Sequence, residues 1–246
     1  MELQVAEMIG ASARSRAEVS RRAGVHRSTV YRMLEGSTDI RLETLQEIAY
    51  ACGFEIEMSF RPTSDPAAAD AGRLLLDGTL QGVADVSAEI AAWMDRLQRF
   101  SGDEPIEVAA ESGVAASLLH RDGAIGMRGE FSVDRLASAG HAMGTAWALS
   151  GTFALEALGG EHDDQPTNVL WVQDPIHAFQ LLADTGTRES QLARAELIIC
   201  APGELTLEGR TDLDGIQFVA PTQAIIDSMG LKPAQRVAAR HIAQGW

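Results

Sequence analysis

The sequence predicts a small all-α N-terminal domain with a short terminal strand, followed by a larger α/β or α+β C-terminal domain with a mixed sheet. Three observations support this division. Apolar residues recur at helical spacing through residues 3–52, a stretch with two prolines and many small residues follows, and helical and strand patterns alternate beyond it. We therefore expect a domain at 1–60, a linker at 61–72 and a second domain at 73–246.

The first three helices of the N-terminal domain are predicted from apolar spacing and from their end signals. An apolar stripe over residues 3–13 predicts the first helix. Ser15, with Glu18 three positions later, predicts the start of the second. Gly24 can adopt the left-handed conformation of a tight turn, so it ends this helix and a third follows over about 26–34.

A fourth helix and a strand complete the first domain. Leucine, isoleucine, alanine and cysteine recur at helical spacing over 42–52, and this pattern predicts a helix that closes the bundle. Apolar and polar residues then alternate strictly over 54–60, as they do in a half-buried strand. The result is a compact unit of about sixty residues.

Composition excludes several classes of protein. The 246 residues include 20 basic and 35 acidic side chains, for a formal charge of −15, and 46% are hydrophobic, enough for an ordinary core. No apolar run reaches about 18 residues and no basic segment precedes an apolar one at the N-terminus, so we expect no membrane span, no signal peptide and a cytoplasmic location. Cys52 and Cys200 stand far apart, which predicts buried thiols and no disulfide framework.

Charge is spread unevenly along the chain. Residues 1–64 carry eight arginines against nine acids, whereas residues 65–246 carry 12 basic against 26 acidic side chains, a net charge of −14. Within 14–32 the only acid is Glu18, and six arginines are present: Arg14, Arg16, Arg21, Arg22, Arg27 and Arg32. Such an excess favours contact with nucleic-acid phosphates, because arginine neutralises them and releases counterions. The alternative is a solvated helical face.

The segment 15–34 combines a short helix, a glycine turn and a second helix, with Val19, Val25, Val30 and Met33 predicted to point inward. This is the pattern of a helix-turn-helix. With the helix that follows, it resembles the lambda-repressor/Cro-like (XRE-type) DNA-binding domain over about sixty residues. The alternative is a helix pair that docks a protein.

In the XRE-type family the second helix of the pair lies in the major groove and its first turns meet base edges. The resemblance therefore implies two groups of DNA-binding residues in this chain. The first group would read bases or flanking phosphates: Arg27, Ser28, Thr29, Tyr31 and Arg32. The second group would hold the DNA backbone: Ser15, Arg16 and Arg41.

The C-terminal domain shows an alternation of helices and strands. Predicted helices lie at 86–100, 106–119 with an interruption near Gly113, 133–144, from 151, from 175, 221–229 and 233–243. Predicted strands lie at 146–149, 168–172 and 197–201, with a hairpin of 205–209 and 216–219.

Two short stretches of this domain resemble known families. The strand, glycine turn and helix over 144–159 are similar to nucleotidyltransferase-like folds, in which such a turn cradles phosphate. The stretch 219–227 resembles the C-terminal portion of AbiEi-type antitoxin regulators. Transferase catalysis needs two acids on the strand after the turn. That strand, 168–172, is apolar, and Asp163 and Asp164 precede it in an expected loop, so we expect no transferase activity. A helix cap is the other interpretation of the turn at 150–152.

We expect no catalytic residues, no metal and no cofactor. The six histidines include no pair at the spacing of a helical metal site, and a Gly-x-Ser-x-Gly elbow is absent. The expected function is that of a sequence-specific transcriptional regulator, a homodimer that binds double-stranded operator DNA and represses its own operon. A toxin or a small-molecule effector would bind the C-terminal domain. If the partner is a toxin, this chain is its antitoxin. The alternatives are a nucleotidyltransferase-like enzyme with a DNA-binding head and a phage-type immunity repressor.

Overall fold

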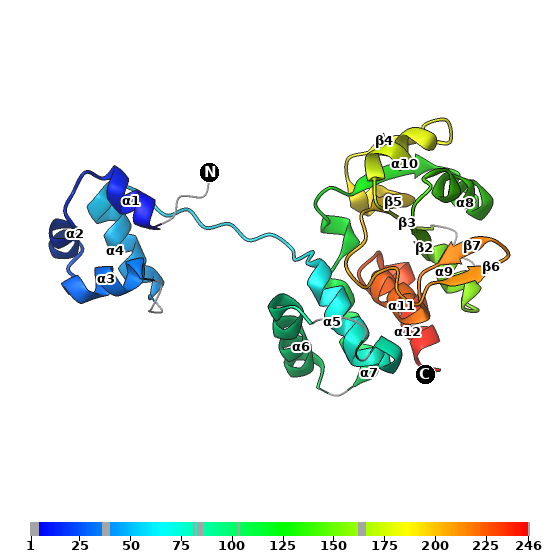
Figure 1. Ribbon diagram of the computed structural model, residues 1–246, viewed down its shortest axis with the longest axis horizontal. Helices are drawn as coiled ribbons and strands as arrows, with labels where there is room; N and C mark the ends of the chain where they lie inside the picture. Colours follow the sequence, from blue (N-terminus) through cyan, green and yellow to red (C-terminus); the bar gives the residue numbers. More distant parts are fainter. Residues whose placement is uncertain are drawn as a thin grey trace. The chain divides into compact units, whose positions relative to one another are not determined.

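The computed structural model describes residues 5–35, 40–80, 82, 86–102, 104–161 and 166–245. The chain forms two compact units, Met1–Arg61 and Pro62–Trp246, which we describe separately (Figure 1). In the described part of the chain, no helix is long and apolar enough to cross a membrane.

The first unit is a bundle of four helices: α1 (Val5–Ala11), α2 (Arg16–Arg22), α3 (Arg27–Leu34) and α4 (Leu42–Cys52). Val19 of α2, Val30 of α3 and Ile48 of α4 are fully buried and form the centre of its core. The hydroxyl of Ser15 accepts a hydrogen bond from the Glu18 amide at 3.2 Å, which confirms the predicted helix start. The four predicted helices are therefore present in the predicted order.

The predicted strand at 54–60 is wrong for the single chain. These residues form no strand in the structure, because no other described segment lies beside them to share backbone hydrogen bonds. The alternation of faces is nevertheless present. Phe54 and Ile56 are half-buried against the core of the first unit, whereas Met58 and Phe60 on the same side of the segment are exposed.

The predicted linker at 61–72 is wrong over its second half. Pro66–Leu76 forms helix α5, which begins at Asp65, whose carboxylate accepts a hydrogen bond from the Ala67 amide at 3.0 Å. The small residues serve close packing, not flexibility: a Cβ atom at Gly72 would lie 2.2 Å from the hydroxyl oxygen of Ser112. Proline starts this helix at its first turn, where its missing N–H costs nothing.

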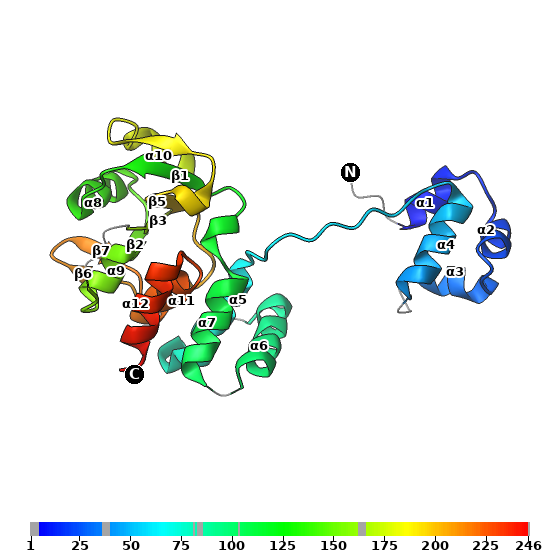
Figure 2. The same ribbon diagram turned by 180° about the vertical axis from the view of Figure 1, so that it is seen from behind.

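Helices α5, α6 (Ala88–Ser101) and α7 (Pro105–Ala115) pack against one another at the start of the second unit (Figure 2). Two further helices, α11 (Pro221–Met229) and α12 (Pro233–Ala243), lie where the sequence predicts them. Helix α11 contacts α5, α7 and α12 as well as the sheet, so it forms the middle layer between the sheet and the outer helices. The interruption predicted near Gly113 is absent, because this glycine permits a close helix contact inside a continuous α7.

The contact at Gly113 gives a stability prediction. A Cβ atom there would lie 2.4 Å from the carbonyl oxygen of Ile226 in α11. Alanine normally favours a helix over glycine by about 1 kcal/mol. Here we expect Gly113→Ala to lower the free energy of unfolding by about 1–3 kcal/mol, because α7 and α11 must move apart. The measurement is urea unfolding followed by tryptophan fluorescence, since all four tryptophans lie beyond residue 62.

The matched control is Gly78→Ala in the 3-10 turn η1 (Gly78–Leu80), where a Cβ atom would meet no neighbouring atom within 4 Å. We expect this control to change the free energy of unfolding by less than about 0.5 kcal/mol. Equal effects of the two substitutions would contradict the packing explanation.

The sheet of the second unit has seven strands in the order β4-β1-β5-β3-β2-β7-β6. Their bounds are β1 (Ile125–Gly129), β2 (Trp147–Gly151), β3 (Asn168–Val172), β4 (Gly186–Glu189), β5 (Leu197–Cys200), β6 (Thr211–Leu213) and β7 (Ile216–Phe218). The sheet is mixed, as predicted: β3 is parallel to β5 and β2 to β7, and the other pairs are antiparallel. Every residue of β2, β3 and β5 is buried, so these strands form the core.

Shorter helices connect and cover the strands: α8 (Val133–Ala142), α9 (Thr152–Ala157) and α10 (Pro175–Leu181), with 3-10 turns η2 (Leu118–His120) and η3 (Leu192–Arg194). The prediction of β3 is confirmed residue for residue, and those of β2 and β5 to within two residues. The predicted hairpin is wrong in its first strand, because 205–209 forms a bend and a turn, of which only 205–207 are buried, and the partner of β7 is β6. The sequence patterns do not predict strands β1, β4 and β6.

Candidate nucleic-acid interface

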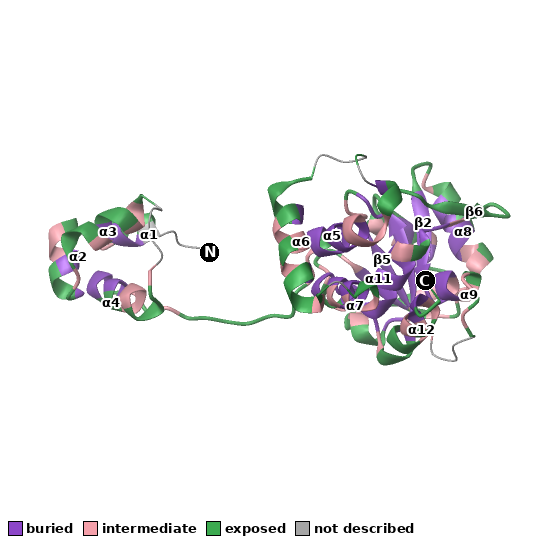
Figure 3. Ribbon diagram, turned by 90° about the horizontal axis from the view of Figure 1, so that it is seen from below, coloured by how far each residue is buried: buried purple, intermediate pink, exposed green. Residues whose placement is uncertain are grey.

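Helices α2 and α3 pack through buried valines and leave one face of α3 open to solvent. Arg27, Ser28, Tyr31 and Arg32 are exposed, and their spacing places them on the same side of the helix. Much of α3 is coloured as exposed in Figure 3. Thr29 is half-buried beside the core residue Val30. The structure thus brings four of the five residues predicted to face DNA onto one polar helix face.

The first turn of α3 is held by His26, which the sequence prediction missed. Its Nδ1 accepts a hydrogen bond from the Ser28 amide at 3.3 Å and lies 2.7 Å from the Ser28 hydroxyl oxygen. Histidine is not among the residues usually preferred at this position, so the sequence contains no common signal for the cap. The cap leaves Arg27, the first residue of α3, projecting beside the helix N-terminus.

Two of the three residues predicted to hold the DNA backbone lie at the start of α2. Arg16 places its guanidinium over the ring of Tyr31, 5.2 Å from the ring centroid. This contact joins α2 to the exposed face of α3. The hydroxyl of Ser15 is used as the α2 cap. The third, Arg41, is exposed at the N-cap position of α4, two residues after the segment 36–39, which lies outside the described part of the chain.

The arginines of 14–32 do not all serve the same purpose. Arg14 donates to the carbonyl oxygen of Ala51 at 2.6 Å and so stabilises the C-terminal end of α4. Arg22 pairs with Glu18 at 3.0 Å. Counting charge along the sequence therefore does not show which arginines are available to a ligand, because Arg14 and Arg22 already have partners within the fold.

Comparison with known proteins gives the structural class of these helices. Residues 4–58 match the family model described as helix-turn-helix. This segment is a helix-turn-helix domain. The match covers the four-helix unit and does not extend into the second unit. Neither a curated protein nor a solved structure matches the chain.

The helix-turn-helix domain supports a DNA-binding regulator in preference to an enzyme. Its second helix, α3, is the one that such domains place in the major groove. The nucleic-acid interface predicted from the sequence therefore lies on a domain of the appropriate class, while the role of each residue stays a prediction.

Two backbone amides at the glycine turn that starts α9 have side-chain acceptors within the fold. The side-chain oxygen of Asn168 accepts a hydrogen bond from the Phe153 amide at 3.0 Å, and the hydroxyl of Thr152 accepts one from the Thr167 amide at 2.9 Å. Gly151 has a φ of +74°, and a Cβ atom there would lie 2.3 Å from the Thr167 carbonyl oxygen. These contacts favour the helix-cap interpretation over a phosphate cradle. Asp163 and Asp164 lie outside the described residues.

A buried polar network crosses the centre of the second unit. Asp227 of α11 accepts hydrogen bonds from the indole nitrogen of Trp171 at 3.0 Å and from the side-chain amide of Gln223 at 2.7 Å. Burial raises the pKa of Asp227. The Gln223 oxygen in turn accepts from Arg73, whose side chain is fully buried. All four residues are buried, and the network joins α5, α11 and β3.

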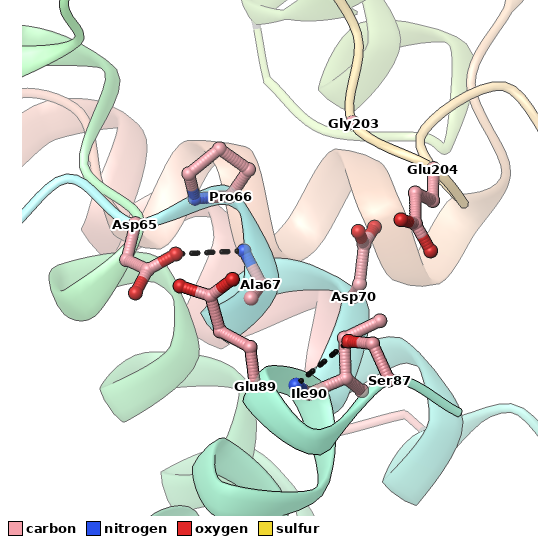
Figure 4. Close-up of a pocket in the computed structure, with 9 residues that line it drawn as sticks. All are labelled: Asp65, Pro66, Ala67, Asp70, Ser87, Glu89, Ile90, Gly203 and Glu204. Carbon is pink, nitrogen blue, oxygen red and sulfur yellow. Dashed lines mark hydrogen bonds between the residues drawn. The ribbon is translucent and has the colours of Figure 1, made fainter.

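A small acidic pocket opens beside α5 (Figure 4). Its volume is about 210 Å³, and its lining includes the carboxylates of Asp65, Asp70, Glu89 and Glu204. Asp65 also accepts a hydrogen bond from the indole nitrogen of Trp93 at 2.7 Å. Among the described residues, no group of three or more His, Cys, Asp or Glu side chains has the geometry to hold a metal ion.

Asp70 in this pocket makes the stability of the second unit depend on pH. Its side chain is 2% exposed, and burial raises its pKa from 3.8 to about 6, although the Leu205 amide donates to it at 3.2 Å. The folded protein therefore binds this proton more tightly than the unfolded chain. The contribution of Asp70 to the free energy of unfolding is fully present below pH 4 and is lost as the pH rises through about 6. This loss is about 3 kcal/mol.

Asp70→Asn should remove that loss while keeping an oxygen for the Leu205 amide. We expect the free energy of unfolding of the wild-type protein to fall between pH 4 and pH 7 relative to that of the variant. Urea titrations followed by tryptophan fluorescence at these pH values measure the difference. Parallel pH profiles would contradict the assignment.

Proposed function

We propose that this chain is a sequence-specific transcriptional repressor that binds operator DNA through α3. The observation that carries the proposal is the exposed face of α3, bearing Arg27, Ser28, Tyr31 and Arg32, within a helix-turn-helix domain. The major groove is wide enough to admit an α-helix, and arginine and serine side chains can hydrogen-bond to base edges there.

The predicted DNA-contacting residues fall into two groups in this proposal. Arg27, Ser28, Thr29, Tyr31 and Arg32 read bases or the phosphates that flank them. Ser15, Arg16 and Arg41 hold the DNA backbone, and the stacking of Arg16 on Tyr31 fixes the position of both side chains relative to α3. Phosphate contacts of this kind orient the domain, while base contacts select the sequence.

The proposed regulator acts as a homodimer on its own operon. A two-fold operator presents half-sites about 34 Å apart, and two helix-turn-helix domains are needed to fill both. Occupation of the operator excludes the polymerase by steric repression.

The second unit is proposed to bind the partner that controls the regulator, either a toxin or a small-molecule effector. Residues 65–246 carry a net charge of −14, which opposes close approach to DNA but suits a basic protein surface. A toxin with such a surface would make this chain an antitoxin, and a small-molecule effector is the other proposed partner.

The proposal is tested by measuring binding of the full-length protein to the DNA immediately upstream of its own gene and to random DNA of equal length, at two salt concentrations. We expect tighter binding to the upstream fragment at both salt concentrations, because base contacts survive screening better than phosphate contacts do. Equal affinity for the two fragments would contradict sequence-specific regulation.

A further inference from the structure

The segment 54–60 ends the helix-turn-helix unit with the pattern of a strand that has no partner. Phe54, Ile56, Met58 and Phe60 share one side, and Phe60 is 94% exposed. Within the described part of the chain, no backbone hydrogen bond joins residues 55–60 to another segment. Alternating apolar residues on an unpaired backbone form a template for pairing with another strand.

We propose that this segment is the dimerisation element of the helix-turn-helix unit, pairing antiparallel with the same segment of a second copy of the chain. The inference rests on the homodimer proposed above and not on DNA binding. It names the surface that joins the two copies, and it accounts for both the strict alternation and the exposed apolar side chains.

Charge and pattern together select one register. In an antiparallel pair, directly opposite residues lie on the same face, so the two residue numbers must add to an even number if apolar residues are to meet apolar ones. Centring the pair on Met58 places Ile56 opposite Phe60 of the second copy. The same register places Glu55 opposite Arg61 and Glu57 opposite Ser59, so both charged positions meet a compatible side chain.

The neighbouring registers are less favourable. Centring on Ile56 places Glu55 opposite Glu57, and centring on Glu57 places that residue opposite itself. A parallel pair would set Glu55 beside Glu55 and Glu57 beside Glu57. Like charges directly opposite one another destabilise a strand pair, which disfavours these registers. Centring on Ser59 sets Glu57 opposite Arg61, but among the four apolar residues it pairs only Met58 with Phe60. The register centred on Met58 also pairs Ile56 with Phe60 and Met58 with itself, so it is the favoured one.

A cysteine at the centre of the pair tests the register. In the full-length protein, Met58→Cys places two thiols opposite each other, about 4.5–5.5 Å apart between Cα atoms, within reach of a disulfide. The control Ser59→Cys places its thiols about 8 Å apart by the rise along the strands, too far for a disulfide. Both native cysteines are buried, so they contribute little background.

Under mild oxidation without DNA, we expect Met58→Cys to form a covalent dimer at least about tenfold faster than Ser59→Cys, because only the first satisfies disulfide geometry. Equal rates, or no covalent dimer from either variant, would overturn the proposal. Because the oxidation experiment contains no DNA, its result does not depend on whether the protein binds DNA. The DNA-binding proposal is tested separately, by the affinity measurement with the upstream fragment.

Exchange of the facing charges gives a second test. Glu55→Arg and Arg61→Glu should each weaken the dimer roughly tenfold, because symmetry makes each substitution break two cross-strand pairs. The double variant Glu55→Arg/Arg61→Glu should recover most of the loss. Sedimentation equilibrium measures the dissociation constants, and a double variant as weak as the sum of the single ones would overturn the proposed register.

Discussion

Replacing Arg27 and Arg32 together by alanine is expected to weaken binding to the operator about 100-fold, since each arginine contact contributes roughly 1–3 kcal/mol. Both residues lie on the exposed face of α3, and Arg27 begins the helix beside its capped N-terminus. Neither arginine belongs to the buried core of the bundle, so the fold should be retained. Fluorescence anisotropy with the upstream DNA fragment, at fixed salt, measures the affinity.

The matched control is Arg99→Ala/Arg188→Ala, which removes two exposed arginines of the second unit. The net charge then changes equally in both double variants. We expect the control to alter operator affinity by less than about threefold, because these side chains lie outside the helix-turn-helix domain and act only through screened long-range charge. Comparable losses in the two variants would show that overall charge, and not α3, determines binding.

The second large effect is expected on stability. Arg73→Ala should lower the free energy of unfolding of the second unit by about 3–5 kcal/mol, the usual cost of removing one partner from a buried charged network. Arg73 donates to the Leu205 and Glu208 carbonyl oxygens, both at 3.2 Å, and to Asp77 at 3.3 Å. Without the guanidinium, these acceptors and the side-chain oxygen of Gln223 lose a donor, and a cavity remains.

An exposed arginine provides the comparison. Arg240 forms two hydrogen bonds to Glu107, at 2.7 and 3.1 Å, and this partner lowers the pKa of the glutamate, yet the Arg240 side chain is 40% exposed. Solvent screening should limit the effect of Arg240→Ala to about 1 kcal/mol. Tryptophan-detected urea unfolding measures both variants. A cost for Arg73→Ala no larger than that for Arg240→Ala would contradict the role assigned to the buried network.

Local signals in the sequence were sufficient for the helix-turn-helix unit. Its helices begin and end at residues with their own physical preference, such as Ser15 and Gly53, whose φ is +86°. The same holds for α11 and α12, which start at proline. Elements that depend on partners distant in sequence were harder to predict. Strand β4 has half-exposed and polar residues, so its identity depends on pairing with β1.

The incorrect predictions share a physical cause. The small residues of 66–72 suggest flexibility until their neighbours are known, because close helix packing requires the same composition as a linker. The strand predicted at 54–60 has the right alternation, but a strand also requires a partner that one chain does not provide.

Of the candidate site, the sequence predicted the helix and most of its exposed face. It did not predict that Arg14 would be committed to the carbonyl oxygen of Ala51, or that His26 would cap α3. These structural roles of Arg14 and His26 depend on which groups are close in the folded domain. Counting charges along the sequence does not separate arginines with such roles from arginines that could contact DNA.

The most direct test of the central claim is methylation interference on the upstream DNA with the full-length protein. Methylation of guanine N7 blocks the major groove at single positions. If α3 reads this groove, methylated guanines should be depleted from the bound DNA in two clusters about 10 base pairs apart, one for each domain of the dimer. Binding that persists with no position-dependent depletion would contradict the assignment of α3 as the recognition helix.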